Sequence, residues 1–170
     1  MLAFVSMRVD DARGKADPMH PDVRVAQAGP VDLDTVTTLF LGYLDFYEAP
    51  ADRAEARQFL SDRMTRGEST VLLARIGAQA AGFTQLYPSF SSVRRAPIWV
   101  LNDLFVDPAF RGRGVGRTLL RTAADLAEQN GVVRIELSTD ESNSTAQALY
   151  ESEGYRTGFP VRHYLRRIGA

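Results

Sequence analysis

The stretch 101-LNDLFVDPAFRGRGVGRT-118 decides the fold of this 170-residue chain. An apolar run ends at Asp107, and three alternate glycines, Gly112, Gly114 and Gly116, then lead into a helical pattern. This order of strand, glycine loop and helix start builds an anion site, because the first backbone N–H groups of a helix have no acceptor within it. Glycine also lets the backbone approach a ligand closely. The pattern predicts a turn that binds phosphate.

Four arginines without an acid between them accompany this turn: Arg111, Arg113, Arg117 and Arg121. Guanidinium groups suit a polyphosphate, since they present several donors in a planar fork. The alternative is a tight turn with solvated arginines. It is disfavoured because each glycine costs about 0.5–1 kcal/mol relative to alanine in regular structure.

Three phosphate-loop motifs compete for this stretch. A P-loop needs Gly-Lys followed by Ser or Thr, and the single lysine of the chain is Lys15. A dinucleotide fingerprint begun at Gly112 meets Arg117 where its third glycine belongs. Its ribose-binding acid would be Glu136, but no second nucleotide-binding half follows. The third motif, R-x-x-G-x-G, fits Arg111, Gly114 and Gly116.

Hydrophobic periodicity predicts a single α/β domain with a mixed sheet of about six to seven strands and about four helices. Residues 1–21 are expected to form a loose N-terminal extension before a domain over residues 22–170. A polar loop is predicted over 89–95. The predicted strands cover 22–27, 70–76, 80–87, 97–106, 132–138 and, as one bent strand or two, 155–167; the predicted helices cover 33–47, a stretch to about 65, 115–130 and 143–153.

Composition excludes several kinds of function. The chain has no cysteine, which rules out disulfides, thiolate metal sites and a cysteine nucleophile. His20 and His163 have no partners at metal-ligand spacing, so no metal site is predicted. A net charge of −1 gives no overall attraction to nucleic acid or membrane, and no apolar run approaches the ~20 residues of a membrane span. The first residues lack the pattern of a signal peptide, which predicts a cytoplasmic protein.

A second motif lies one helix and one strand beyond the glycine loop. It reads N-x-x-A-x-x-L-Y-x-x-x-G-Y, with its defined positions at Asn143, Ala146, Leu149, Tyr150, Gly154 and Tyr155. Together with LNDLFVDP and R-x-x-G-x-G, it closely resembles the GNAT superfamily of acyl-CoA-dependent N-acetyltransferases. The resemblance covers about residues 22–167.

The resemblance implies a cofactor site for acetyl-CoA. Its pyrophosphate would lie on the amides of the loop, and its pantetheine arm would follow the end of the preceding strand. In this family that strand splays from its neighbour, and the thioester sits in the gap. The implied cofactor-binding residues are Leu104, Phe105, Val106, Arg111, Gly112, Arg113, Gly114, Val115, Gly116, Arg117, Thr118, Asn143 and Tyr150. Asn143 also fits a simple helix cap, and Tyr150 a core tyrosine.

Without cysteine, direct attack of an amine on the bound thioester in a ternary complex is the expected mechanism. An amine with a pKa of ~10.4 costs about 4–5 kcal/mol to deprotonate at pH 7, whereas an α-amino group near ~7.8 costs about 1 kcal/mol. The resemblance makes Asp103 the candidate base and Tyr150 the candidate acid for the leaving thiolate. Asp103 would otherwise be an acid of a turn or sheet edge.

The sequence indicates the residues that bind the acceptor amine less clearly than those that bind the cofactor. Residues 31–55 hold six acids and one arginine, which suits a cationic amine or, equally, a solvated helix face. The resemblance implies that the first two helices wall the acceptor pocket, with Tyr43, Phe46, Tyr47 and Glu48 as candidates. The expected substrate is a primary amine of a polyamine, an amino acid or a basic peptide or protein. The alternative function is a non-catalytic acyl-CoA sensor or interaction module, and a homodimer is a family expectation.

Overall fold

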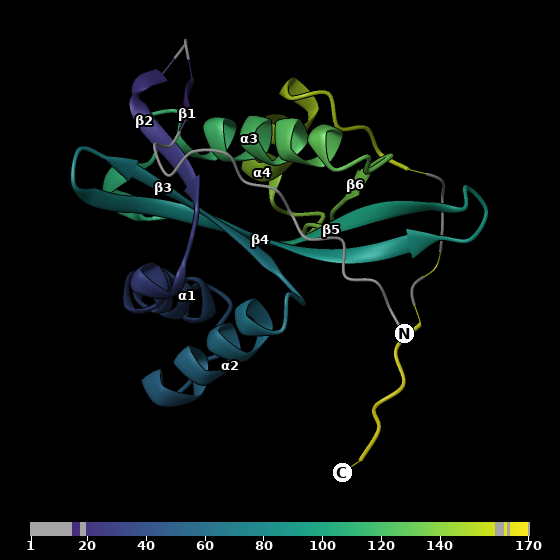
Figure 1. The fold of residues 1–170 in the computed structure, drawn as a ribbon, viewed down its shortest axis with the longest axis horizontal. Coiled ribbons are helices and arrows are strands. Elements are labelled where there is room, and N and C mark those ends of the chain that lie inside the picture. The colour runs from purple at the N-terminus through teal and green to yellow at the C-terminus, as the bar shows by residue number, and fades with distance from the viewer. Residues whose placement is uncertain (1–14, 18–19, 159–161, 163, 170) are drawn as a thin grey trace.

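A computed structural model describes residues 15–17, 20–158, 162 and 164–169 (Figure 1). Its sheet has six strands in the order β1-β2-β3-β4-β5-β6: β1 (Lys15–Asp17), β2 (His20–Gln27), β3 (Thr70–Ile76), β4 (Gln79–Ser91), β5 (Ala96–Val106) and β6 (Ile135–Glu136). The α-helices of the described residues are α1 (Leu33–Phe46), α2 (Arg53–Thr65), α3 (Val115–Gln129) and α4 (Ser144–Ser152). Two 3-10 helices, η1 (Pro30–Asp32) and η2 (Pro108–Phe110), precede α1 and the glycine loop.

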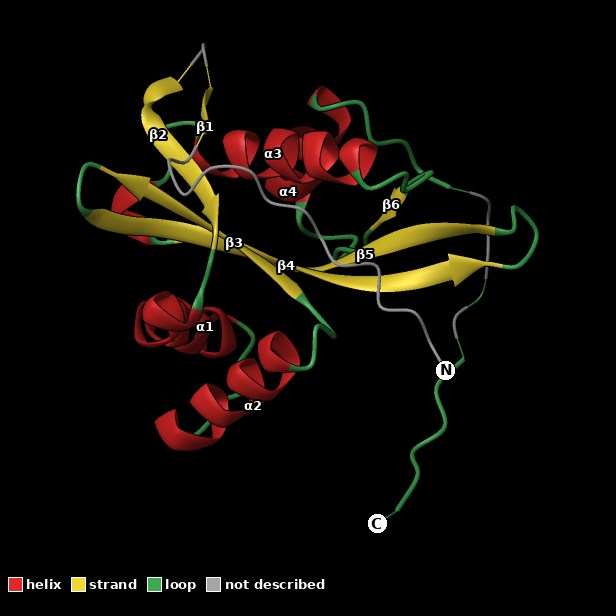
Figure 2. Ribbon diagram, in the orientation of Figure 1, coloured by secondary structure: helices red, strands yellow, loops and turns green. Residues whose placement is uncertain are grey.

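The first five strands pair antiparallel in sequence order, and β6 joins β5 in parallel. Helices cover both faces of this mixed sheet, α3 and α4 one face and α1 and α2 the other (Figure 2). Because the central strands are covered on both sides, their side chains are buried without alternation: residues 71–74 of β3 and 81–86 of β4 are all buried, including the polar Thr84 and Gln85. The sheet therefore separates two cores.

Each core is built from a helix stripe at helical spacing. On the α3 face, Leu119, Leu120 and Ala123 pack with Leu72 and Trp99. On the opposite face, α1 and α2 supply a stripe that packs on two phenylalanines of β4 and β5; this core includes Val36, Phe40, Leu60, Phe83 and Phe105. Each face of the sheet therefore has its own helical layer. Both layers contact residues at the end of β5.

Strand β5 contains an extra residue at its centre. Gln85 of β4 pairs with Asp103 and Leu86 pairs with Leu101, so Asn102 has no partner across the ladder. A bulge of this kind shifts the alternation of side chains by one. Leu101 therefore faces the α3 core, whereas Asp103 lies on the same face as Phe105, toward α1.

The structure confirms the predicted fold class and most predicted elements. The α/β architecture, the mixed sheet, four helices and the positions of β2, β3, β5 and α1–α4 agree with the sequence pattern. The strand count falls at the low end of the expected range, and β1 and β6 are only three and two residues long. The sheet also begins earlier than expected, since β1 and the first residues of β2 lie within the stretch predicted as a loose extension.

Three predicted elements differ from the structure. Residues 89–91, predicted as loop, continue β4 and pair with residues 96–98, because strand pairing is made by backbone groups and does not require an apolar run. Of the strand predicted over 132–138, only Ile135–Glu136 forms a strand, although Val133 donates to the Pro97 carbonyl at 3.0 Å and the Arg134 carbonyl accepts from Trp99 at 3.1 Å. The predicted C-terminal strand is wrong for residues 155–158, 162 and 164–167, which are neither strand nor helix, because alternation alone supplies no neighbouring strand; residues 159–161 and His163 lie outside the described residues.

The close pairing of β4 with β5 gives a first test. A Cβ on Gly82 would lie 2.5 Å from the carbonyl oxygen of Phe105 and 3.1 Å from Val115 Cγ1. We expect Gly82→Ala to destabilise the protein by about 1–3 kcal/mol, because the backbone of β5 must shift. Chemical denaturation measures the free energy of unfolding.

The matched control is Gly29→Ala, since a Cβ on Gly29 meets nothing within 4 Å and its φ is −107°. This variant should stay within about 0.5 kcal/mol of the parent protein. Equal stability of the two variants would contradict the close approach at Gly82.

Candidate active site

The glycine loop turns the chain from β5 into α3. Asp107 caps η2 by accepting a hydrogen bond from the Ala109 amide at 2.8 Å. Gly112 and Gly114 then adopt φ values of 73° and 80°, which glycine tolerates and other residues rarely do. These two conformations form the turn that lets α3 begin close to the end of β5.

The N-terminus of α3 carries no side-chain cap. Gly114 is the N-cap residue, and its carbonyl accepts from the Thr118 amide at 2.9 Å. By helix geometry, the amides of residues 114–117 have no acceptor within α3. Four unpaired donors at the positive end of a 15-residue helix form a site for an anion.

A cavity of about 690 Å³ opens next to these amides. It exists because β5 and β6 pair only at Trp99–Ile135 and Val100–Glu136 and then diverge. Beyond Val100, one wall comes from β5 and the other from the segment after β6 and from α4, while α1 closes the far end. The expected splay of the central strands is therefore confirmed.

Most of the residues predicted for the site line this cavity. On the cofactor side they are Leu104, Phe105, Val106, Arg111, Gly112, Gly114, Val115, Gly116, Arg117, Asn143 and Tyr150. On the acceptor side they are Tyr43, Phe46 and Tyr47. Residues more than 100 positions apart in the chain thus share one surface.

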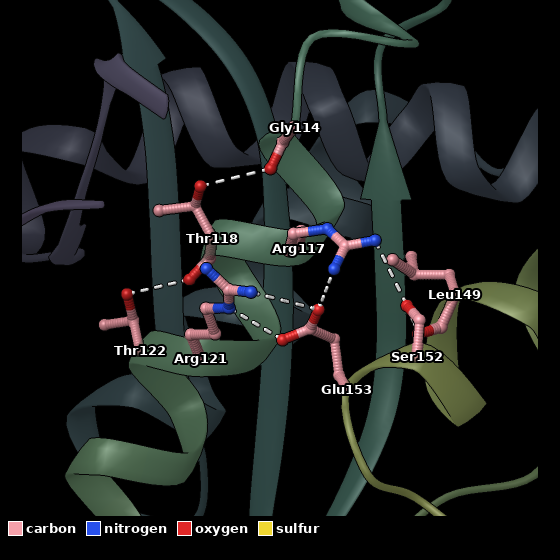
Figure 3. A network of polar contacts seen from close by, with 8 residues as sticks. All are labelled: Gly114, Arg117, Thr118, Arg121, Thr122, Leu149, Ser152 and Glu153. Atoms are coloured by element: carbon pink, nitrogen blue, oxygen red, sulfur yellow. Dashed lines mark hydrogen bonds and ion pairs between the residues drawn. The ribbon is translucent and has the colours of Figure 1, made fainter. Parts of the chain in front are cut away.

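Four predicted residues are not among the described residues that line the cavity: Asp103, Arg113, Thr118 and Glu48. The Arg113 guanidinium lies over the Phe110 ring, 5.7 Å from its centroid. Thr118 is buried, and its hydroxyl donates to the Gly114 carbonyl at 3.1 Å (Figure 3). Glu48 is exposed just after α1.

Three of the six acids between residues 31 and 55 are engaged in ion pairs or a helix cap. Asp32 and Asp34 accept from Arg75 and Arg57, each at 2.7 Å, and Asp52 caps α2. These three carboxylates stabilise η1, α1 and α2, so the acid count between residues 31 and 55 does not measure the charge of the pocket.

The structure adds residues that the sequence pattern did not single out. The His20 ring lies on Gly114: a Cβ built there would be 2.3 Å from its Cγ and Cδ2 atoms. Asn102 reaches the cavity from the bulge, and Ser138 and Thr139 from the segment after β6. No local motif marks these positions, since pairing of the N-terminal strands and divergence of β5 from β6 bring them to the site.

Tyr150 lies in the wall formed by α4. Asn143 caps this helix by accepting from the Ala146 amide at 3.1 Å, and the Tyr150 ring lies 6.0 Å from that of Tyr155. Burial, together with nearby Tyr47, raises the pKa of Tyr150. The hydroxyl therefore keeps its proton at neutral pH and acts as a donor.

Asp103 lies behind the cavity wall and is only 3% exposed. Burial raises the pKa of its carboxyl, although hydrogen bonds from the Tyr43 hydroxyl and the Asn102 amide act in the opposite direction. The Asn102 Nδ2 lies 3.0 Å from Asp103 Oδ1. Tyr43 and Asn102 both line the cavity, so each connects the buried carboxylate to it.

The described residues contain no group of three or more His, Cys, Asp or Glu side chains arranged to hold a metal ion. In the same part of the chain, every helix is too short or too polar to span a bilayer.

The fold and the cavity define an α/β protein with an anion site at the point where two sheet strands part. The Acetyltransferase (GNAT) family matches residues 36–155, and the chain belongs to this family. Members of this family use acetyl-CoA in general, and the chain is an acyl-CoA-dependent N-acetyltransferase.

Individual relatives agree with this assignment. The chain is 40% identical over 148 residues to the uncharacterised N-acetyltransferase YhfO of Bacillus subtilis strain 168, covering 87% of this chain and 99% of that protein. It is 40% identical over 97 residues to the N-alpha-acetyltransferase RimI of Mycobacterium tuberculosis, covering 56% and 60%. A crystal structure of a probable acetyltransferase superposes with a TM-score of 0.81 at 36% identity, covering 86% and 99%.

The contact between His20 and Gly114 gives a second test. Alanine at Gly112 or Gly114 strains a left-handed backbone, by about 1–2 kcal/mol. Only Gly114→Ala also drives a Cβ into the His20 ring, since nothing lies within 4 Å of the Cβ position at Gly112. Gly114→Ala should therefore destabilise the protein more than Gly112→Ala.

Adding His20→Ala should recover the excess loss in the Gly114 variant but not in the Gly112 variant. Denaturation curves of five variants (the two glycine variants, His20→Ala alone and the two double variants) and of the parent protein measure this coupling. Purely additive effects of His20→Ala and Gly114→Ala would show that the ring does not lie on the loop.

Proposed function

We propose that the cavity binds acetyl-CoA and that the chain transfers its acetyl group to a primary amine. The observation that carries this proposal is the opening of three groups into one cavity: the unpaired amides of α3, the free edge of β5 and the Tyr150 hydroxyl. The first suits a diphosphate, the second an amide-containing arm, and the third a leaving thiolate.

The residues present fit such a ligand. Gly112 leaves open space where a side chain would stand, and Gly116 allows Leu149 and Val106 to approach, because its Cβ would lie 3.1 Å and 3.6 Å from them. Arg111, on the cavity wall, donates from Nε to the Val106 carbonyl at 3.3 Å and leaves its other nitrogens for a phosphate. After Val100, β5 pairs with β4 but has no partner in β6, so those of its backbone groups that point away from β4, other than the Val106 carbonyl, are available to a ligand.

Acetyl-CoA, when bound, supplies the acetyl group as a thioester, whose C–S bond breaks as the new C–N bond forms. The protein must then accept one proton from the amine and provide one to the sulfur. Asp103 is the proposed acceptor. Its carboxylate lies behind the wall, so the proton reaches it through the Tyr43 hydroxyl, which donates to Asp103 and lines the cavity.

Tyr150 is the proposed proton donor. Its raised pKa keeps the hydroxyl protonated over the neutral range, and Tyr150 lines the cavity together with Tyr47, which directly follows α1. A hydrogen bond to the sulfur stabilises the charge that develops as the C–S bond breaks.

For the acceptor, an α-amino group of a peptide or amino acid is favoured over a polyamine. Deprotonation of an α-amino group at pH 7 costs about 1 kcal/mol, against about 4–5 kcal/mol for an alkyl ammonium. A buried base that acts through a tyrosine hydroxyl is better suited to the amine with the smaller deprotonation cost. The similarity to an N-alpha-acetyltransferase supports the same class.

A direct test follows thiol release from acetyl-CoA with a panel of peptides, amino acids, polyamines and aminoglycosides. We expect saturable turnover with one class, and Tyr150→Phe should lower kcat by about 100-fold or more because the proton donor is lost. Tyr155→Phe is the control, since it removes from the neighbouring ring a hydroxyl that has no hydrogen-bond partner among the described residues. Tight binding of acetyl-CoA without turnover on any amine would instead support a sensor.

The proposed role of Asp103 predicts a pH dependence. A base must be ionised, so kcat/KM should fall as the pH falls through the pKa of Asp103, which lies above the usual value of about 3.9. Asp103→Asn should lower kcat/KM at pH values above this pKa and remove the acidic limb from the profile, so that the two proteins converge at low pH.

The same substitution should not destabilise the protein at pH 7. A folded-state pKa above the unfolded value means that the ionised carboxylate costs stability at pH 7, and that this cost disappears as the pH falls through the folded pKa. Asn removes the charge and still accepts a hydrogen bond from Tyr43. A large loss of stability together with unchanged pH dependence would contradict a catalytic role for Asp103.

A further inference from the structure

Helix α4 carries Asn143 and Tyr150 into the cavity, yet it is weakly embedded in the fold. It has nine residues and none of them is fully buried. Its apolar contacts come from one side, where Leu149, Tyr150 and the following Tyr155 pack against the α3 core. A helix this short is not stable through its own hydrogen bonds, so contacts with the rest of the protein must fix its position.

One carboxylate provides such a contact. Glu153 is the C-cap residue of α4, and its side chain is only 7% exposed. It accepts hydrogen bonds from two guanidinium groups of α3, that of Arg117 and that of Arg121, with Arg121 Nε at 2.7 Å (Figure 3). Arg117 also donates to Ser152 Oγ at 3.1 Å, and that hydroxyl donates to the Leu149 carbonyl at 2.8 Å.

This contact joins the two halves of the proposed site. Arg117 lies in the first turn of α3, and its own amide is one of the unpaired donors. Tyr150 lies one helical turn before Glu153, whose amide donates to the Tyr150 carbonyl at 3.0 Å. The ion pairs therefore connect the phosphate-binding turn to the proposed proton donor through one side chain.

The same carboxylate also changes the charge available to a phosphate. Two of the four arginines that follow β5 have guanidinium groups bound to Glu153. An arginine held by a buried carboxylate offers less net charge to a ligand than one in solvent. The site thus holds Arg117 beside the cavity but directs its guanidinium toward α4.

We propose that Glu153 is a positioning residue that fixes Tyr150 relative to the phosphate-binding turn and restrains Arg117 from the cofactor. The proposal rests on the transferase function proposed above. Its signature is a split between two parameters: loss of the carboxylate lowers the rate of the chemical step, because Tyr150 is displaced, and strengthens nucleotide binding, because Arg117 is released.

The test compares Glu153→Gln with Glu151→Gln, which removes the same charge from an exposed position on the same helix. For Glu153→Gln we expect kcat to fall by up to about 100-fold, as expected for a misplaced catalytic group. The dissociation constant of coenzyme A, measured by calorimetry, should fall by about two- to fivefold, the worth of one exposed ion pair. Glu151→Gln should change neither value.

Two further measurements separate positioning from general damage. Adding Arg117→Gln to Glu153→Gln should abolish the tighter binding without restoring kcat. Hydrogen exchange of the α4 amides, measured without any ligand, should become faster in Glu153→Gln and stay unchanged in Glu151→Gln.

An unchanged kcat in Glu153→Gln, or a weaker binding of coenzyme A that parallels the loss of kcat, would overturn the proposal. Failure of the proposed function has a different outcome: the parent protein would then turn over none of the amines, or Tyr150→Phe would leave turnover unchanged, while the binding and exchange measurements on Glu153→Gln would still give their own result.

Discussion

Strands β5 and β6 exchange hydrogen bonds over only two residue pairs before they separate. At this end of the sheet, the loss of pairing leaves backbone groups of β5 that need other partners. The cavity forms at this place, with the start of α3 at one end and α1 at the other. A ligand with an amide-containing arm can replace the missing strand, so the same defect in the sheet supplies both the space and the hydrogen bonds for binding.

Several charged side chains around this gap are held by contacts within the protein. Arg111 remains on the cavity wall, Arg113 stacks on Phe110, and Arg117 binds a buried carboxylate. Most of the attraction for an anion therefore comes from amides that cannot move away, rather than from long side chains that must be ordered on binding. Carboxylates near α1 follow the same pattern, since Asp32 and Asp34 serve ion pairs within the fold.

The glycine loop, the helices and the central strands could be predicted from sequence because each leaves a local pattern. Gly112 and Gly114 adopt the left-handed conformations that only glycine favours, and Asn143 caps α4 as its residue type suggests. Contacts made between distant segments leave no such pattern. His20 on Gly114 and Glu153 between two arginines depend on strand pairing and helix packing, and the expected C-terminal strand shows that alternation cannot supply a neighbour.

The bulge at Asn102 has a consequence for how such a site can evolve. Because this extra residue reverses the alternation within β5, one strand presents Leu101 to one layer and Asp103 to the other. Deleting a single residue there would turn the side chains on one side of the deletion toward the opposite helical layer, even though the remaining residues are unchanged. The length of β5 is therefore constrained as strongly as its side chains. Point substitutions can change the acceptor substrate with less disturbance of the fold than insertions or deletions in this strand.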